Sequence, residues 1–280
     1  MTAEVGESPA SEPATSAEQP ASSERSASPD FVQSLARGLA VITAFDADHP
    51  RQTLSEVART TGLTRATARR FLHTLVELGY VDCAGSAFWL TPRVLDLGYS
   101  YLSAMPLADL AQPHLERLSA QLDESSSVAV LDGYDIVYVG RVQVRRIMTI
   151  GITIGTRFPA FATSMGRVLL AALPPAELDA YLTGTDLRVL TPHGIADEAE
   201  LRAELAAVAD RGWSLVDQEL EPGLRSLAAP VRDRDGRVVA ALNLSTHAAR
   251  YSTEQLRDEL VPVVVDAARA LSVDLASVNR

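Results

Sequence analysis

Six side chains between residues 64 and 73 have the chemistry needed to contact a polyanion. Three are arginines, whose guanidinium groups donate paired hydrogen bonds to phosphate oxygens or to the edge of guanine. Two hydroxyls and one imidazole lie among them and add further polar contacts. The set is Thr64, Arg65, Thr67, Arg69, Arg70 and His73. These residues predict a helix face that binds the backbone and base edges of DNA.

Two short helices joined by a glycine-containing turn are predicted to carry this face. Thr53 and Glu56 form a capping box, in which each side chain satisfies an amide group at a helix start. Gly62 ends that helix, because a left-handed residue is least strained as glycine, and Thr64 caps the next one. The inner face of the first helix holds Leu54, Val57 and Ala58. The inner face of the second holds Ala68, Phe71, Leu72, Leu75 and Leu78.

A small hairpin is predicted directly after the second helix. Gly79 ends the helix, and β-prone residues 80–81 and 88–90 flank the turn-rich residues 83–86. A helix-turn-helix followed by a wing is typical of proteins that read the major groove. A small helical bundle with solvated arginines is the alternative. It accounts less well for a cap, a turn, a polar face and a wing that follow one another in this order.

Composition limits the remaining possibilities. The 280 residues are 47% apolar and carry a net charge of −11, and every basic residue is arginine. Residues 31–103 hold seven Arg against six acidic residues, whereas residues 104–280 hold 17 Arg against 24, so most of the acidity lies outside the predicted DNA-binding part. Cys83 alone cannot form a disulfide framework and fits a reducing compartment. No apolar run approaches the roughly 18 residues of a membrane span, so we expect a soluble, cytoplasmic protein.

Four segments are predicted along the chain. They are a disordered Ser/Ala/Pro/Glu-rich tail (1–30), a winged helix-turn-helix (31–91), a connector helix (92–105) and a second domain (106–275). The first helix begins near Ser34 with Leu35, Leu39, Ile42 and Phe45 as its core face. Thr91 and Pro92 start the connector, whose apolar residues are Val94, Leu97, Tyr101 and Leu102. Met105 and Pro106 mark the boundary.

The second domain mixes helices and strands. Asp132-Gly133 and Asp235-Gly236 are tight hairpin turns between β-prone runs. Helices are predicted at 107–122, 164–172, 175–183, 197–211 and 253–271, and strands at 128–131, 136–139, 147–150, 213–216, 227–232 and 238–245. Hairpins at both ends with helices between them predict an α+β fold with an antiparallel sheet, similar to GAF-type ligand-sensing modules.

Signals of catalysis are absent. The five histidines are scattered without metal-ligand spacing, residues 163–166 (TSMG) lack the first glycine of a nucleophile elbow, and residues 151–155 match no phosphate-binding loop. We therefore predict no catalytic residues, no cofactor and no metal.

Short motifs in both domains carry a family resemblance. They are 34–42 (SLARGLAVI), 90–93 (LTPR), Gly155 with Pro159, 163–166 (TSMG), 218–219 (QE), 223–225 (GLR), 228–231 (AAPV) and 240–243 (AALN). In this order they resemble an IclR-type transcriptional regulator over almost all of 31–271. A second set most resembles the β-ketoadipate-pathway regulators, which control the breakdown of aromatic acids. That set is 31–34 (FVQS), 74–80 (TLVELGY), 145–148 (RRIM), 191–193 (TPH) and 245–250 (STHAAR).

The resemblance implies a ligand-responsive regulator that binds operator DNA as a homodimer or tetramer. It also implies an effector pocket made by Ile150, Thr163, Ser164, Met165, Leu224, Ser226, Asn243 and Ser245. Met148 would add to the apolar walls. An anionic effector also suits the helix start near Ser164, whose amides are unpaired. Val216 stands where some family members have an acidic residue, which argues against transferring their small-acid effector.

Several alternatives remain open at this stage. Arg225, Arg145 and Arg146 could neutralise an effector carboxylate, but an internal salt bridge of Arg225 with Glu219, or a solvated surface, is equally consistent with the sequence. The effector could instead be an unrelated acid, such as a sugar acid or a glyoxylate-like compound. The winged helix could also mediate protein contacts in a sensor or enzyme that binds no DNA. The connector would transmit effector binding as a population shift between two states.

Overall fold

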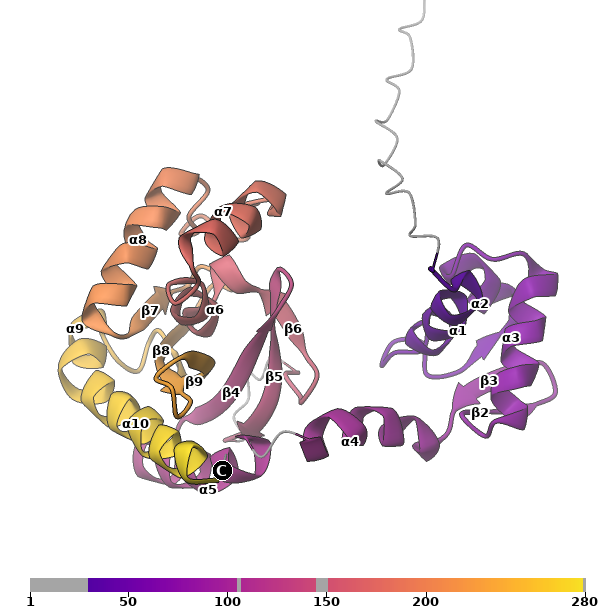
Figure 1. Ribbon diagram of the computed structural model, residues 1–280, viewed down its shortest axis with the longest axis horizontal. Coiled ribbons are helices and arrows are strands. Elements are labelled where there is room, and N and C mark those ends of the chain that lie inside the picture. The colour runs from indigo at the N-terminus through magenta and orange to yellow at the C-terminus, as the bar shows by residue number, and fades with distance from the viewer. Residues whose placement is uncertain (1–29, 105–106, 145–150, 279–280) are drawn as a thin grey trace, which may run out of the picture. The chain divides into compact units, whose positions relative to one another are not determined.

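The computed structural model describes residues 30–104, 107–144 and 151–278 (Figure 1). They form two compact units that divide between Val94 and Leu95. Most of the predicted tail, the boundary at 105–106 and the predicted strand at 147–150 lie outside the described residues.

Three helices form the first unit: α1 (Gln33–Thr43), α2 (Leu54–Thr60) and α3 (Arg65–Glu77). Thr53 and Glu56 make the predicted capping box, and the Thr64 hydroxyl accepts the amide hydrogen of Thr67 at the start of α3. Gly62 has a φ of +66°, which is the left-handed conformation expected of the turn. The helix-turn-helix is therefore determined by local capping and turn chemistry.

A three-stranded sheet completes this unit, in the order β1 (Gln52–Thr53), β3 (Ala87–Leu90), β2 (Val81–Ala84). The wing is present, but its turn is shorter than predicted. Cys83 and Ala84 pair with Phe88 and Ala87 in the sheet, and Gly85, with a φ of +60°, begins the turn. The strand β1 was not predicted because two residues carry no periodicity.

The predicted inner face of α1 is partly wrong. Val41 is completely buried and Phe45 is 8% exposed, whereas Leu35 and Leu39 are 64% and 50% exposed. Leu78, assigned to the inner face of α3, is also half exposed. Helical periodicity identifies an apolar stripe but not what covers it. A shallow apolar groove accordingly runs between α1 and α3.

The connector starts later than predicted. Residues Pro92–Val94 form a 3₁₀ turn, and α4 spans Leu95–Ala104. The Thr91 hydroxyl accepts the amide hydrogen of Arg93 and donates to the carbonyl oxygen of Gly79, so it anchors the turn to the end of α3.

A six-stranded antiparallel sheet forms the centre of the second unit, in the order β6-β5-β4-β9-β8-β7. Its strands are β4 (Ser125–Asp132), β5 (Asp135–Val142), β6 (Arg157–Pro159), β7 (Ser214–Asp217), β8 (Leu224–Arg232) and β9 (Val238–His247). Both predicted hairpins are confirmed, with Gly133 and Gly236 in left-handed conformation.

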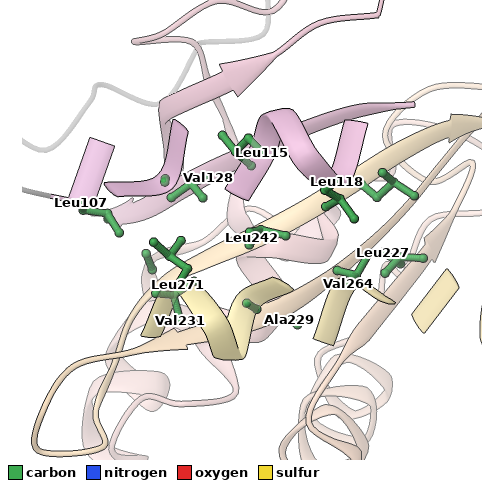
Figure 2. Close-up of a cluster of buried hydrophobic side chains, with 14 of the residues drawn as sticks. Leu107, Leu115, Leu118, Val128, Leu227, Ala229, Val231, Leu242, Val264 and Leu271 are labelled. Carbon is green, nitrogen blue, oxygen red and sulfur yellow. The ribbon is translucent and has the colours of Figure 1, made fainter. Parts of the chain in front are cut away.

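Helices cover both faces of this sheet. On one face α5 (Leu107–Leu122) and α10 (Val261–Val278) pack side by side, and Figure 2 shows Leu115, Leu118, Val264 and Leu271 meeting strand side chains such as Leu242. On the other face lie α6 (Ser164–Leu170), α7 (Pro175–Gly184) and α8 (Glu198–Arg211). The last helix is preceded by α9 (Thr253–Gln255) and a π-helical turn at Leu256–Leu260. Because both faces are covered, successive residues in the middle of β4 and β9 are buried instead of alternating between buried and exposed.

Candidate functional site

The outer face of α3 presents the side chains predicted to contact DNA. Ala68, Leu72 and Leu75 are buried against the unit's core, which turns the opposite face of the helix outward. That face exposes Thr64, Arg65, Arg69, Arg70 and His73. No ion pair of the three arginines is recorded within the described residues, so their guanidinium donors face solvent.

Thr67 differs from the other five. It is half-buried, and its hydroxyl oxygen lies 2.9 Å from that of Thr64, within the helix cap. Thr67 therefore orients the start of α3 more than it offers a free contact.

The wing adds a cation that the sequence analysis missed. The Arg51 guanidinium lies 4.2 Å from the centre of the Trp89 ring, across the pairing of β1 with β3. Such stacking holds a guanidinium in a preferred place without neutralising it. Arg51 precedes a strand too short to be read from periodicity, which is why it escaped notice.

The second unit contains a cavity between the start of α6 and strands β7, β8 and β9. Its cavity volume is about 20 Å³, and the free space reaches about 370 Å³ only when the open solvent at its mouth is counted. Seven predicted effector residues line it: Thr163, Ser164, Met165, Leu224, Ser226, Asn243 and Ser245. The remaining wall is Tyr138, Ile152, Ala162, Val216 and Leu220. Ile150, Met148, Arg145 and Arg146 lie outside the described residues.

The polar groups of the cavity are arranged in pairs. The hydroxyl oxygens of Ser164 and Ser226 are 2.9 Å apart, and the Asn243 side-chain amide donates to the Ser245 hydroxyl at 3.1 Å. The Asn243 Oδ1 is buried and accepts no hydrogen bond in the described part of the chain. An unpaired buried acceptor is costly unless a ligand or water supplies a donor.

Tyr138 places a neutral phenol at the cavity wall. Burial raises the pKa of Tyr138 to about 12, because the phenolate is disfavoured away from water. The hydroxyl therefore stays protonated at neutral pH and can donate a hydrogen bond.

A buried ion pair connects α6 to the segment that carries Leu220 and Leu224 of the cavity wall. The Arg167 guanidinium donates two hydrogen bonds to the Glu219 carboxylate, from Nη1 at 2.8 Å and from Nη2 at 2.5 Å. Its Nε donates to the carbonyl oxygen of Phe161 at 2.9 Å. Glu219 precedes Leu220 and Leu224 of the cavity wall, so the pair ties this segment to α6.

Arg225 does not pair with Glu219, so that alternative is wrong. Its Nε lies 2.6 Å from Asp217 Oδ1, and its Nη1 donates to the carbonyl oxygens of Ala248 and Tyr251. The cross-strand register places Arg225 opposite Asp217, which a reading based on sequence proximity to Glu219 could not show. These contacts occupy the guanidinium and leave it little capacity to bind a ligand.

The described residues contain neither a metal-ligand cluster nor a membrane-spanning helix. No three His, Cys, Asp or Glu side chains gather there as metal ligands. None of the helices in those ranges has the length and apolar character needed to cross a bilayer.

Two family models match the chain in succession. The IclR helix-turn-helix domain covers residues 34–82, and the bacterial transcriptional regulator IclR C-terminal domain covers residues 99–273. The chain belongs to the IclR family of transcriptional regulators. Its helix-turn-helix is thus a DNA-binding domain, and the prediction that the chain is not an enzyme is confirmed by the family.

Individual relatives agree with this assignment. A Pca regulon regulatory protein of Pseudomonas putida is 46% identical over 87% of this chain and 84% of its own length. A protein of Rhodococcus sp. RHA1 described as a transcriptional regulator has 62% identity and a TM-score of 0.81, covering 89% of this chain and 100% of that one. An IclR homologue from Microbacterium hydrocarbonoxydans, solved in complex with 4-hydroxybenzoate, has 26% identity and a TM-score of 0.78, covering 87% and 99%. The predicted resemblance to regulators of the β-ketoadipate group is confirmed at the level of these names.

Proposed function

We propose that this regulator controls genes for aromatic-acid catabolism and responds to a hydroxylated aromatic acid such as protocatechuate or 4-hydroxybenzoate, or to β-ketoadipate. The observation that carries the proposal is the cavity on the α6 side of the sheet. Its apolar wall residues Ile152, Met165 and Leu224 suit a ring, and its polar groups Ser164, Ser226 and Asn243 suit ring substituents. The Microbacterium homologue, solved with 4-hydroxybenzoate, supports the same class of compound.

A gel-shift titration on the DNA upstream of the protein's own gene and its neighbours tests this proposal. The titration is repeated with protocatechuate, 4-hydroxybenzoate, β-ketoadipate, a sugar acid and glyoxylate. A specific shift altered by one of the first three supports the proposal. A shift altered only by the sugar acid or by glyoxylate would show that the effector belongs to that class of acid and not to the aromatic acids. No specific shift, or one that is insensitive to salt, favours a protein-binding sensor, because DNA binding weakens steeply with ionic strength.

Arg69→Ala should weaken operator binding. Arg69 is exposed at the middle of the outer face of α3, where a contact to phosphate or guanine is worth about 1–3 kcal/mol. We expect the Kd to rise roughly 5- to 150-fold in fluorescence anisotropy at moderate salt. Arg269→Ala, which removes an exposed arginine of α10, is the control. Equal operator affinity of the Arg69 variant and the wild type would contradict the orientation proposed for α3.

We also propose that the regulator binds its operator as a dimer in which α1 of one copy covers α1 of the other. Leu35, Leu39 and Leu78 leave an apolar stripe on the first unit, and such stripes mark association surfaces. Two copies would place two α3 helices in successive major grooves.

Leu39→Asp should therefore dissociate the dimer. A carboxylate in the middle of the stripe carries a desolvation penalty that a solvated monomer avoids. Sedimentation velocity is expected to show the wild type as a dimer or tetramer and the variant at about half that mass. Ser34→Asp at the end of the same groove is a milder control. A wild type that sediments as a monomer at micromolar concentration would remove the basis for this surface.

A further inference from the structure

Arg141, on β5, is a half-buried cation with no anionic partner among the described residues. Its Nη1 donates to the Ser127 hydroxyl at 3.0 Å, and its Nε is buried with no acceptor in the described residues. None of the ion pairs recorded for the described residues includes Arg141. Burial lowers the pKa of Arg141, because desolvation disfavours its charged form. A buried charge without a partner lowers the stability of the fold, so its retention suggests a functional role such as binding an anion.

A β-bulge directs Arg141 to the cavity side of the sheet. Tyr138 pairs with Ala129 and Gly140 pairs with Val128, so Val139 is the extra residue on β5. Residues three apart on a regular strand point to opposite faces, but the bulge brings Tyr138 and Arg141 to the same face. Tyr138 lines the cavity.

The sheet register then places Arg141 in one row with a cavity residue. Arg141 lies opposite Ser127, and Ser127 lies opposite Asn243 on the next strand. Two such steps span about 10 Å between Cα atoms. The Arg141 side chain already extends along this row, because its Nη1 reaches Ser127. At the end of the row, Asn243 is 2% exposed and its Oδ1 accepts no hydrogen bond from the described residues.

Two other arginines near the cavity, within the described residues, already have carboxylate partners. Arg167 is bound bidentately by Glu219, and Arg225 by Asp217. Residues 145–150, which follow β5 outside the described part, contain no Asp or Glu that could neutralise Arg141.

We propose that Arg141 binds the carboxylate of the effector and that Asn243 Oδ1 accepts a hydrogen bond from a hydroxyl group of the same molecule. The two groups lie on one row of the sheet. This separation suits a ligand that has a carboxylate at one end and a hydroxyl group at the other. This inference rests on the proposed function, since it assigns the charge-recognising residue of the same cavity. It also identifies a specificity residue outside the family-derived set of pocket positions.

Isothermal titration of the full-length protein tests the assignment. The probes are 4-hydroxybenzoate and protocatechuate, each compared with its neutral carboxamide, which keeps the shape and removes the charge. Arg141→Gln should weaken binding of the acids about 10- to 100-fold, as expected for a lost charged hydrogen bond, and change carboxamide binding by less than about threefold. Arg141→Lys keeps the charge without the fork and should retain most of the affinity. Arg269→Gln, on the opposite face of the sheet, is the matched control.

The Asn243→Ala variant tests the second proposed contact, the hydrogen bond from the effector hydroxyl to Asn243 Oδ1. It should reduce the preference for 4-hydroxybenzoate over unsubstituted benzoate about tenfold while leaving benzoate binding nearly unchanged. An unaltered preference would remove Asn243 from the assignment.

Thermal melting of the ligand-free protein distinguishes a loss of effector binding from a loss of stability. Removing an unpaired half-buried charge should leave the melting temperature of the ligand-free Arg141→Gln protein equal to or above that of the wild type. Wild-type protein that binds an acid, with Arg141→Gln binding it equally well, overturns this inference alone. Equal losses in the Gln and Lys variants also overturn it. Wild-type protein that binds none of the acids overturns the proposed effector class and this inference with it.

Discussion

Arg167→Met is expected to destabilise the second unit by about 3–5 kcal/mol. The substitution leaves the Glu219 carboxylate buried without its two charged hydrogen bonds, and an uncompensated buried charge costs about that much. For a unit of this size the melting temperature should fall by roughly 6 to 20 °C. Fluorescence of Trp213 follows this unit in a Trp89→Phe background, because the protein has two tryptophans and the other lies in the wing.

The double variant Arg167→Met/Glu219→Met is the control for this prediction. With both charges removed, the desolvation penalty disappears, and much of the lost stability should return. Losses that simply add in the double variant would show that the two side chains act independently. The single variant should also bind effector more weakly, since the pair anchors the segment that carries Leu220.

Gly166→Ala is expected to disrupt the cavity directly. A Cβ at this position would overlap the backbone of Ala160, including its carbonyl oxygen, so either α6 or the 3₁₀ turn at Ala160–Ala162 must shift. Backbone cannot rotate away as a side chain does, and overpacking of this kind costs about 1–3 kcal/mol or more. Ala162, Thr163, Ser164 and Met165 border the cavity, so effector affinity should fall together with stability.

Gly98→Ala is the matched control. Gly98 lies in α4, and an added methyl group meets no atom there. Alanine favours a helix by up to about 1 kcal/mol over glycine, so this variant should be as stable as the wild type and bind effector equally well. A Gly166→Ala protein that melts and binds like the Gly98→Ala protein would contradict the close approach of α6 to Ala160. Operator binding, measured at saturating protein, reports whether the first unit is intact.

The helix-turn-helix could be predicted because its determinants are local. The capping box of Thr53 and Glu56, the left-handed Gly62 and the cap at Thr64 act within a few residues of one another. The hairpins at Gly133 and Gly236 are predictable for the same reason. Short elements without periodicity were missed, namely β1 and β6 (Arg157–Pro159), because their strands exist only through pairing with distant partners.

The cavity was predicted less directly. Its polar residues came from a family resemblance, and seven of the eight border one space, with Ile150 outside the described residues. Neither spacing nor composition could have brought Tyr138 and Val216 beside them. The partner of Arg225 was predicted wrongly, because cross-strand register, and not nearness along the chain, selects Asp217 over Glu219.

The sequence by itself determined the local elements and the family, since caps, turns and periodic apolar residues act over a few positions. The tertiary structure alone decided which faces are covered and which charges of the described residues have an ion-pair partner. Leu35 and Leu39 show the first distinction, because an apolar stripe does not reveal what packs on it. Arg141 shows the second distinction, because it has no ion-pair partner among the described residues. One extra residue in β5 turns its side chain toward the cavity. Register and burial arise from contacts between distant segments, and no local pattern records them.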